Sequence, residues 1–411
     1  MGQPLTEGVA RAAVWPDDPG GSGTWREVLV VFLRLGLTAF GGPAAHTGLF
    51  RETLVRRLAW IDDLDFMDLV AATSVIPGPN SSELALAIGR RRAGWPGFVA
   101  AGAGFILPAI VISIVLAWLA VGAATARTVA AVLIGIDPVV VAILVVSVAA
   151  LARSMAGDPA RLVVALLATI AYLAGLAEVG ILLAGAAIVG GWRIVREPRL
   201  GGGASGGSGS SLATGALMAA GGSLATAATV AVGWLPIFLV FLKAGALLFG
   251  SGYVLVALLR ADLVEGLGWI TERQLLDAIA VGQATPGPLT STAGYIGFLL
   301  AGLPGALVAT AGIYLPAMIL VAFLDPIVRA VRTRPLAAAA LRGAGAAALG
   351  LMAGVTLELA AATLVPAGIV ALLPLAVALI AIVALASGRV GPTVLILAGG
   401  FIGLARVFAV G

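Results

Sequence analysis

The polar residues of this chain that could bind a ligand gather around two Pro-Gly-Pro segments inside very apolar sequence. The first break, Pro77-Gly78-Pro79, is followed by Asn80, Ser81, Ser82 and Glu83, and the second, Pro286-Gly287-Pro288, is followed by Thr290, Ser291 and Thr292. Proline interrupts a helix because it lacks an N–H and clashes with the preceding turn. Each break should therefore begin a new helix, whose free N–H groups and positive dipole end suit an anion. A pair of purely structural kinks is the alternative.

A cation also stands inside the apolar run that precedes each break. Arg34 and Lys243 occupy equivalent positions, and glycines follow them, Gly41-Gly42 in the first case and Gly250 in the second. A charge at the centre of a membrane costs about 2.5–3.5 kcal/mol on insertion scales and normally faces a partner or a water-filled path. Two such cations and two helix N-termini would suit a small dianion. Snorkelling of the side chains to the interface is the alternative, and it fits Arg34 better than Lys243.

Four carboxyl groups are candidates for a coupling proton: Asp68, Glu83, Asp137 and Asp277. Asp68 and Asp277 are equivalent and stand near the start of their apolar runs, so capping at the interface is their alternative role. Asp137 lies well inside its apolar run, where we expect it to be protonated or paired. His46, the only histidine, could contact a proton or the anion, or simply pack. One histidine and no cysteine cannot form a typical metal site, so we expect neither metal nor cofactor.

The two breaks belong to a longer duplication. The first copy runs from Phe32 to Leu107-Pro108 and the second from Phe241 to Leu315-Pro316, with a shift of 209 residues as far as the break and 208 after it. Duplicated halves with matching helix breaks are typical of secondary transporters, which bind their substrate where the repeats meet.

The composition excludes a soluble globule. With 61% hydrophobic and 11% charged residues, the chain cannot cover itself with polar surface. The expected fold is an all-α polytopic membrane protein, since no strand-like alternation is sustained. Most of the arginines that give the net charge of +4 stand between apolar runs, and no basic run is interleaved with aromatics, so a nucleic-acid partner is excluded. The chain has no cysteine, one histidine and no clustered carboxylates, which argues against an enzyme.

Apolar runs of about 20 residues, the length that spans a bilayer, predict thirteen transmembrane helices. They lie at roughly 27–48, 66–89, 96–121, 128–150, 160–176, 178–195, 212–232, 234–258, 274–300, 303–324, 338–360, 362–386 and 390–410. The fifth and sixth are short and could instead form one hairpin that dips into the membrane.

The chain divides into two repeats of about six helices. We predict a disordered tail at 1–24, a first repeat at 25–196, a Gly/Ser linker and spacer helix at 197–233, and a second repeat at 234–411. With a cytoplasmic N-terminus, most arginines between spans lie inside, in accord with the positive-inside rule. The exceptions are Arg51, Arg56, Arg57 and Arg127. An odd number of spans separates the starts of the copies, so the second is expected to be inverted and the C-terminus external, in the cell inner (cytoplasmic) membrane.

Several ordered motifs resemble those of the chromate ion transporter family in its long-chain, two-domain form. In the first copy they are Phe40-Gly41-Gly42-Pro43, His46, Trp60, Ile76-Pro77-Gly78-Pro79-Asn80-Ser81, Glu83, Gly94-Trp95-Pro96-Gly97 and Leu107-Pro108, and in the second Phe249-Gly250, Trp269 and Thr285-Pro286-Gly287-Pro288. The resemblance implies a permease that exports chromate from the cytoplasm, coupled to protons, with sulfate as a competing analogue. The second copy departs from the first, because Gly252 replaces Pro43 and nothing matches His46, so any role of His46 would be asymmetric.

The residues themselves leave two alternatives open. Chromate and sulfate share charge and shape, so a carrier of sulfate or another oxyanion fits equally well. An anion channel also fits, since helix breaks and glycine clusters line pores as well. The expected partners are the anion, protons and the lipid bilayer, and the sequence does not distinguish a monomer from a homodimer.

Overall fold

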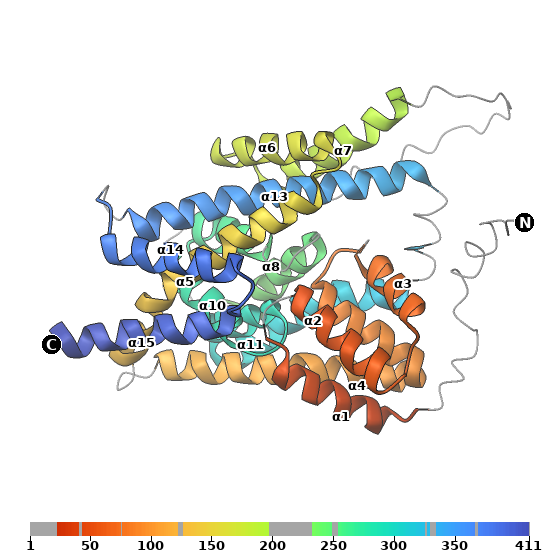
Figure 1. Ribbon diagram of the computed structural model, residues 1–411, viewed down its shortest axis with the longest axis horizontal. Helices are drawn as coiled ribbons and strands as arrows, with labels where there is room; N and C mark the ends of the chain where they lie inside the picture. Colours follow the sequence, from red (N-terminus) through yellow and green to blue (C-terminus); the bar gives the residue numbers. More distant parts are fainter. Residues whose placement is uncertain are drawn as a thin grey trace, which may run out of the picture.

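The computed structural model describes residues 23–40, 43–74, 76–121, 126–196, 232–248, 254–324, 327–328, 334–365 and 369–410. Within these residues the chain is helical and contains no strand (Figure 1). Many large apolar side chains face outward, among them Trp118, Val383 and Phe401. An outer surface this rich in apolar side chains fits a surrounding of lipid, where helices satisfy their own backbone groups.

The two copies are built from the same order of elements, apart from one additional 3-10 turn in the second. The first contains α1 (Trp25–Thr38), α2 (Pro43–Phe50), the π-helical turn η1 (Arg51–Arg57), α3 (Asp63–Thr73) and α4 (Asn80–Val121). The second contains α8 (Trp234–Leu247), α9 (Val254–Leu259), the π-helical turn η2 (Arg260–Gly266), α10 (Glu272–Ala284), the 3-10 turn η3 (Leu289–Ser291) and α11 (Thr292–Ala322). The two π-helical turns start 209 residues apart, which is the shift of the sequence repeat.

Matching caps start the helices that lead into the breaks. The Asp62 carboxylate accepts a hydrogen bond of 2.7 Å from the backbone of Asp65 at the start of α3. Its counterpart Thr271 caps α10 in a capping box with Gln274. Such caps pair N–H groups that a helix start leaves free. Each of these helices therefore has a start set by its cap and an end set by the following prolines.

A sharp turn divides α4 and α11 into two arms each. The turn passes through Gly94 and Gly302, both with φ of 61°. Beyond it the chain folds back, so that Gly89 lies against Gly97 with no space for a side chain between them, and the counterparts in α11 do the same. Small residues allow such close approach of helices in membranes. Each break is therefore followed by a helical hairpin.

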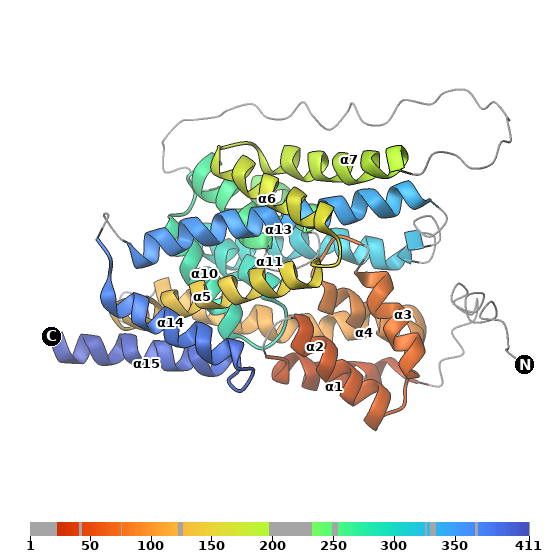
Figure 2. The same cartoon turned by 45° about the horizontal axis from the view of Figure 1, so that its top comes forward.

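The remaining helices pack across the copies in a reciprocal pattern. They are α5 (Ala126–Ser154), α6 (Pro159–Leu173) and α7 (Glu178–Arg196), and after the second copy α13 (Pro335–Leu364), α14 (Leu372–Ala386) and α15 (Pro392–Val410). The helices α6 and α7 pack on α13, whereas α14 and α15 pack on α5 (Figure 1, Figure 2). Gly185 meets Gly343 at the first crossing and Gly135 meets Gly399 at the second. The two halves of the chain are therefore interlocked.

Only some of the described helices are as long as the transmembrane spans that we expected. Four of the described helices are long and apolar enough to cross a membrane, namely Asn80–Val121, Ile134–Ser154, Leu289–Ala322 and Leu336–Leu364. Shorter apolar helices lie at Pro159–Leu173, Glu178–Trp192, Trp234–Leu247, Leu372–Ala386 and Pro392–Ala405.

Some expected elements are corrected by the structure, and others fall outside it. The span expected at 27–48 ends at Thr38, and the one expected at 234–258 ends at Leu247. In the first case Pro43 cannot continue a preceding helix and instead starts α2. Two separate helices, α6 and α7, occupy the spans expected at 160–176 and 178–195. The tail, the Gly/Ser linker and the spacer helix at 212–232 fall almost wholly outside the described residues.

Candidate functional site

A reciprocal pair of backbone hydrogen bonds joins the two Pro-Gly-Pro breaks to the opposite copies. The Gly78 N–H donates to the Leu248 carbonyl at 2.6 Å, and the Gly287 N–H donates to the Ala39 carbonyl at 2.7 Å. Gly78 and Gly287 are counterparts, and so are Ala39 and Leu248, because each pair is 209 residues apart. A twofold relation between two copies produces such an exchange of equal contacts. Each break therefore lies against the interrupted first helix of the other copy.

Both central glycines adopt backbone angles that residues with side chains rarely take, with φ of 146° at Gly78 and 102° at Gly287. A Cβ at Gly78 would overlap the Glu83 carboxyl group and lie 2.9 Å from the Cβ of Ala317. A Cβ at Gly287 would lie 2.9 Å from the Cβ of Ala109, which is the counterpart of Ala317. Only glycine meets both conditions without strain. The contact between the copies thus depends on a glycine at the centre of each break.

The residues that follow the breaks form a buried polar region. Its side chains are Ser81, Ser82, Glu83, Thr290, Ser291 and Thr292. The Thr290 hydroxyl donates to the Tyr314 hydroxyl at 2.5 Å. Ser82, from the other copy, also interacts with Tyr314 but is left without a hydrogen bond of standard geometry. Tyr314 therefore connects the residues after the two breaks, and the sequence reasoning missed it because its counterpart in the first copy is Ile106.

Other polar side chains at the breaks bond within their own copy. The Asn80 side-chain oxygen accepts a hydrogen bond of 2.9 Å from Thr73. In the second copy the Thr292 hydroxyl donates to a backbone carbonyl of η3 at 2.7 Å, and Ser291 and Thr285 share a contact of 3.4 Å. These bonds stabilise the conformation of the backbone at the breaks. A ligand that used these groups would have to compete with them.

Glu83 is the carboxyl group at the breaks. It is fully buried, and neither carboxyl oxygen has a hydrogen-bond partner among the described residues. Near the second break, the side-chain nitrogen of Gln283 is likewise buried without a partner. Leaving buried polar atoms unpaired is costly, most of all for a charged carboxylate. The breaks therefore hold polar groups whose bonding capacity is unused.

His46 packs against the end of α1, where the second break also makes contact. Its Nε2 lies 3.1 Å from the Ala39 carbonyl, the same carbonyl that accepts the Gly287 N–H, and its ring meets Phe105 edge-on at 5.6 Å between centroids. The histidine is buried, and its Nδ1 has no partner in the described part of the chain. The structure thus places His46 at the contact between the copies, in one half only.

The two cations expected at membrane depth are both exposed. Arg34 is exposed on α1. Lys243 is 42% exposed, and its Nζ lies 2.5 Å from the Asp262 carboxylate. The sequence reasoning missed Asp262 because its counterpart in the first copy is Thr53. Three further predicted site residues, Gly41, Gly42 and Gly250, lie outside the described residues.

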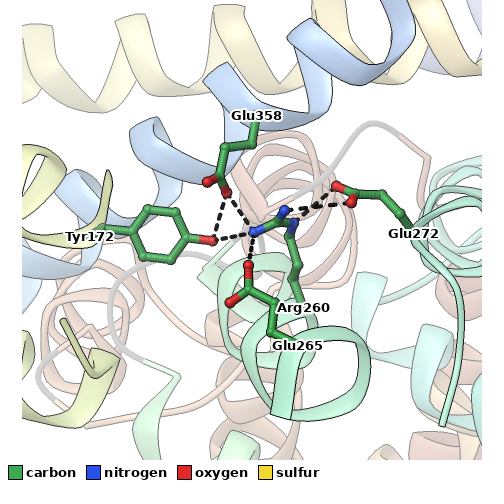
Figure 3. A network of polar contacts seen from close by, with 5 residues as sticks. All are labelled: Tyr172, Arg260, Glu265, Glu272 and Glu358. Atoms are coloured by element: carbon green, nitrogen blue, oxygen red, sulfur yellow. Dashed lines mark hydrogen bonds and ion pairs between the residues drawn. The ribbon is translucent and has the colours of Figure 1, made fainter. Parts of the chain in front are cut away.

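A second polar centre, also missed, surrounds Arg260 in η2 (Figure 3). We call it the Arg260 cluster; its members are Arg260, Tyr172, Glu265, Glu272 and Glu358. The guanidinium contacts Glu272 of α10 at 2.9 Å and Glu358 of α13 at 2.6 Å, and it donates to the Tyr172 hydroxyl of α6 at 3.0 Å. Tyr172 in turn donates to Glu358 at 2.9 Å, and Glu265 contacts the guanidinium from η2. The cluster joins four elements through one buried cation.

The first copy contains the counterpart of this arginine–carboxylate pair in an exposed place. Arg51 donates two hydrogen bonds of 2.6 Å to Asp63, and these bonds lower the pKa of the Asp63 carboxyl group. Both Arg51 and Asp63 precede Arg260 and Glu272 by 209 residues. The signal that could have found the cluster is therefore an arginine and a carboxylate spaced twelve residues apart in both copies.

The carboxyl groups expected to bind protons differ in their exposure and in their contacts. Asp137 of α5 and Asp277 of α10 lie on either side of Arg273, each 3.8 Å from one of its nitrogens. Asp68, the counterpart of Asp277, is exposed. The described residues contain no group of three or more histidines and acids arranged to hold a metal ion.

A known family matches the chain twice, once in each copy. The profile of the family described as Chromate transporter matches residues 26–192 and 235–404. The chain belongs to the chromate transporter family. The first matched region extends from α1 into α7 and the second from α8 into α15, so each contains one Pro-Gly-Pro break. Membership of this family together with the long apolar helices makes the chain a multi-pass membrane protein.

Curated members of the chromate transporter family are similar along most of the chain. The "Chromate transport protein" of Cupriavidus metallidurans is 31% identical over 360 residues, which cover 87% of this chain and 88% of that protein. The "Chromate transport protein" of Pseudomonas aeruginosa is 30% identical, covering 83% and 82%. The "Probable chromate transport protein" of Synechococcus elongatus is 29% identical, covering 81% and 84%. No solved structure matches the chain.

Proposed function

We propose that the chain is a secondary transporter that exports chromate across the cytoplasmic membrane in exchange for protons, with the anion bound between the two breaks. The observation that carries this proposal is the reciprocal pair of hydrogen bonds that joins each break to the opposite copy. A site between two exchangeable copies can open to either side of the membrane in turn. Similar proteins described as chromate transport proteins support chromate as the substrate.

The proposed arrangement in the membrane is an inverted repeat. Residues 25–196 and 234–411 are the two repeats, separated by a spacer span within 197–233 that turns the second repeat over. The exchange of contacts between α6, α7 and α13 on one side and α14, α15 and α5 on the other supports a twofold relation. The N-terminus then lies in the cytoplasm and the C-terminus outside.

The proposed anion ligands are the helix starts after the breaks together with their hydroxyl groups. The first N–H groups of a helix have no partner within it and carry the positive end of the dipole. Ser82 is the strongest side-chain candidate, because its hydroxyl is buried and makes no hydrogen bond of standard geometry among the described residues. Glu83, the next residue, would repel a dianion unless it carried a proton.

Transport into inverted membrane vesicles tests this function. Vesicles that contain the protein should take up radiolabelled chromate with saturation, faster when their interior is acidic, and sulfate should compete. Uptake no greater than in vesicles without the protein would refute a chromate transporter. An anion current proportional to voltage, without saturation, would instead indicate a channel.

Replacing Ser82 by alanine should weaken chromate binding. Losing one hydrogen bond costs about 1 kcal/mol, which corresponds to about a fivefold higher half-saturating chromate concentration. The measurement is uptake into inverted vesicles over a range of chromate concentrations. The matched control is Ser154→Ala at the exposed end of α5, where the hydroxyl bonds only to its own helix. Equal half-saturating concentrations in the two variants would remove Ser82 from the site.

A further inference from the structure

A cluster of Asp137, Arg273 and Asp277 lies where α5 of the first half meets α10 of the second. We infer that this cluster is the proton-binding site of the transporter. The inference rests on the proposed function, because it assigns the proton of that transport cycle to particular residues.

The geometry leaves both carboxyl groups incompletely bonded. Arg273 Nη1 lies 3.8 Å from Asp137 Oδ2, and Nη2 lies 3.8 Å from Asp277 Oδ1. Both distances are too long for hydrogen bonds. Asp137 Oδ1 and Asp277 Oδ1 are buried without any hydrogen-bond partner among the described residues. Asp137 as a whole is only 7% exposed, so its carboxyl group keeps an unpartnered oxygen in a buried place.

The charges of the cluster balance when it holds one proton. Two ionised carboxylates beside one guanidinium leave a net charge of −1, and a single proton cancels it. An uncompensated charge is unfavourable in the interior of a membrane protein. Tyr295 of α11 also faces Asp277, and its hydroxyl is uncharged at neutral pH. The described groups that face the cluster therefore do not supply the missing positive charge, whereas a proton would.

The three side chains of the cluster differ in exposure. The side chain of Arg273 is 47% exposed, whereas those of Asp137 and Asp277 are 10% and 15% exposed. The carboxyl groups are thus mostly enclosed, and Arg273 forms the exposed edge of the cluster. A mostly enclosed site with one exposed edge suits a proton that must be held during a transport cycle.

The position of the cluster connects it to the moving parts of the proposed mechanism. Asp277 stands on α10, which leads directly into the second Pro-Gly-Pro break. Asp137 stands on α5, which also holds α14 and α15. Loss of the proton adds a negative charge at this contact between the halves and so changes the attraction across it. Protonation can thereby favour one arrangement of the copies over the other.

The cluster occurs in one copy only. The counterpart of Asp277 is Asp68, which is exposed, and the counterpart of Arg273 is Leu64. The residue that matches Asp137 in α13 is Gly345. The chain therefore provides one such proton site, and Asp68 serves as the matched control for Asp277.

The test separates proton coupling from anion transport in liposomes that contain the purified full chain. One measurement is exchange of radiolabelled chromate at equal concentrations on both sides, which needs no proton gradient. The other is chromate accumulation driven by an imposed pH gradient. Asp137→Asn and Asp277→Asn should lose accumulation and keep exchange, whereas Asp68→Asn should keep both. Asp277→Glu, which retains a carboxyl group, should restore accumulation with a shifted pH profile.

Each other outcome has a defined meaning. Accumulation at the wild-type level in both asparagine variants would overturn the proton site. Loss of exchange together with accumulation would also overturn it, because the residues would then serve binding or folding. An unshifted pH profile in Asp277→Glu would count against a proton on this residue. Absence of exchange in the wild-type protein would contradict the proposed chromate transport instead, so the two failures are distinguishable.

Discussion

Alanine at Gly78 or at Gly287 should abolish chromate transport while the chain still inserts into the membrane. Both glycines have a positive φ that side-chain-bearing residues rarely adopt, at a cost of about 1–3 kcal/mol. The added methyl group would also meet Glu83 and Ala317 at the first break, and Ala109 at the second. Relief of these clashes must move the break, and with it the hydrogen bond to the opposite copy. The measurement is chromate uptake into inverted vesicles, normalised to the amount of inserted protein.

A glycine in open space provides the control. Gly180 in α7 has no atom within 4 Å of the position that a Cβ would occupy, so Gly180→Ala should transport like the wild type. Wild-type rates in both Gly78→Ala and Gly287→Ala would show that the breaks tolerate displacement. The binding site would then have to be sought elsewhere.

Alanine at Arg260 should destabilise the protein far more than alanine at its counterpart Arg51. Removing one partner of a buried ion pair costs about 3–5 kcal/mol, because the remaining charges lose their compensation. The Arg260 side chain is 10% exposed and contacts three carboxylates, although these are themselves partly exposed, so we expect the lower end of that range. Arg51 forms one exposed pair, which contributes little to stability.

Thermal stability of the detergent-solubilised protein checks this prediction. The fraction that stays monodisperse in size-exclusion chromatography after heating should fall at a markedly lower temperature for Arg260→Ala than for Arg51→Ala. Arg260→Lys should be intermediate, since it keeps the charge but loses the planar fork of donors. Equal stabilities of the two alanine variants would show that the cluster does not stabilise the fold.

Tyr172→Phe removes only the hydroxyl that bridges Arg260 and Glu358, and it should lower the free energy of unfolding by about 1 kcal/mol.

Features that depend on local chemistry could be predicted from the sequence. Proline geometry interrupts α3 before Pro77 and α10 before Pro286 regardless of the surroundings. Hydrophobicity alone requires a membrane, and the 209-residue shift pairs each element with its counterpart. The presence of a π-helical turn in each copy was not predicted, because no residue pattern distinguishes it from an ordinary helix. Its recurrence at Arg51 and Arg260 shows that the duplication extends to backbone detail.

The partners of the polar side chains could not be read from the sequence, because they come from distant parts of the chain. Lys243 is matched with Arg34 by position, yet it is paired with Asp262, for which the first copy has Thr53. Asp137 and Asp277 are separated by 140 positions and meet only because α5 crosses α10. Span counting also placed continuous helices where α1 and α8 end early, since hydropathy does not register a break between apolar segments.

The sequence by itself determined that this protein is a duplicated, helical membrane protein with a break of Pro-Gly-Pro in each copy. Proline, glycine and apolar side chains impose those features locally, so they hold wherever the segment lies. Only the tertiary structure decided which counterpart is buried and which is exposed. Arg260 is enclosed because Glu358 and Tyr172 approach it from α13 and α6, while Arg51 is left in the open and Ala150 stands at the counterpart of Glu358. Two copies that share this arginine–carboxylate pair thus acquire different electrostatic surroundings, because the helices packed against them carry different residues.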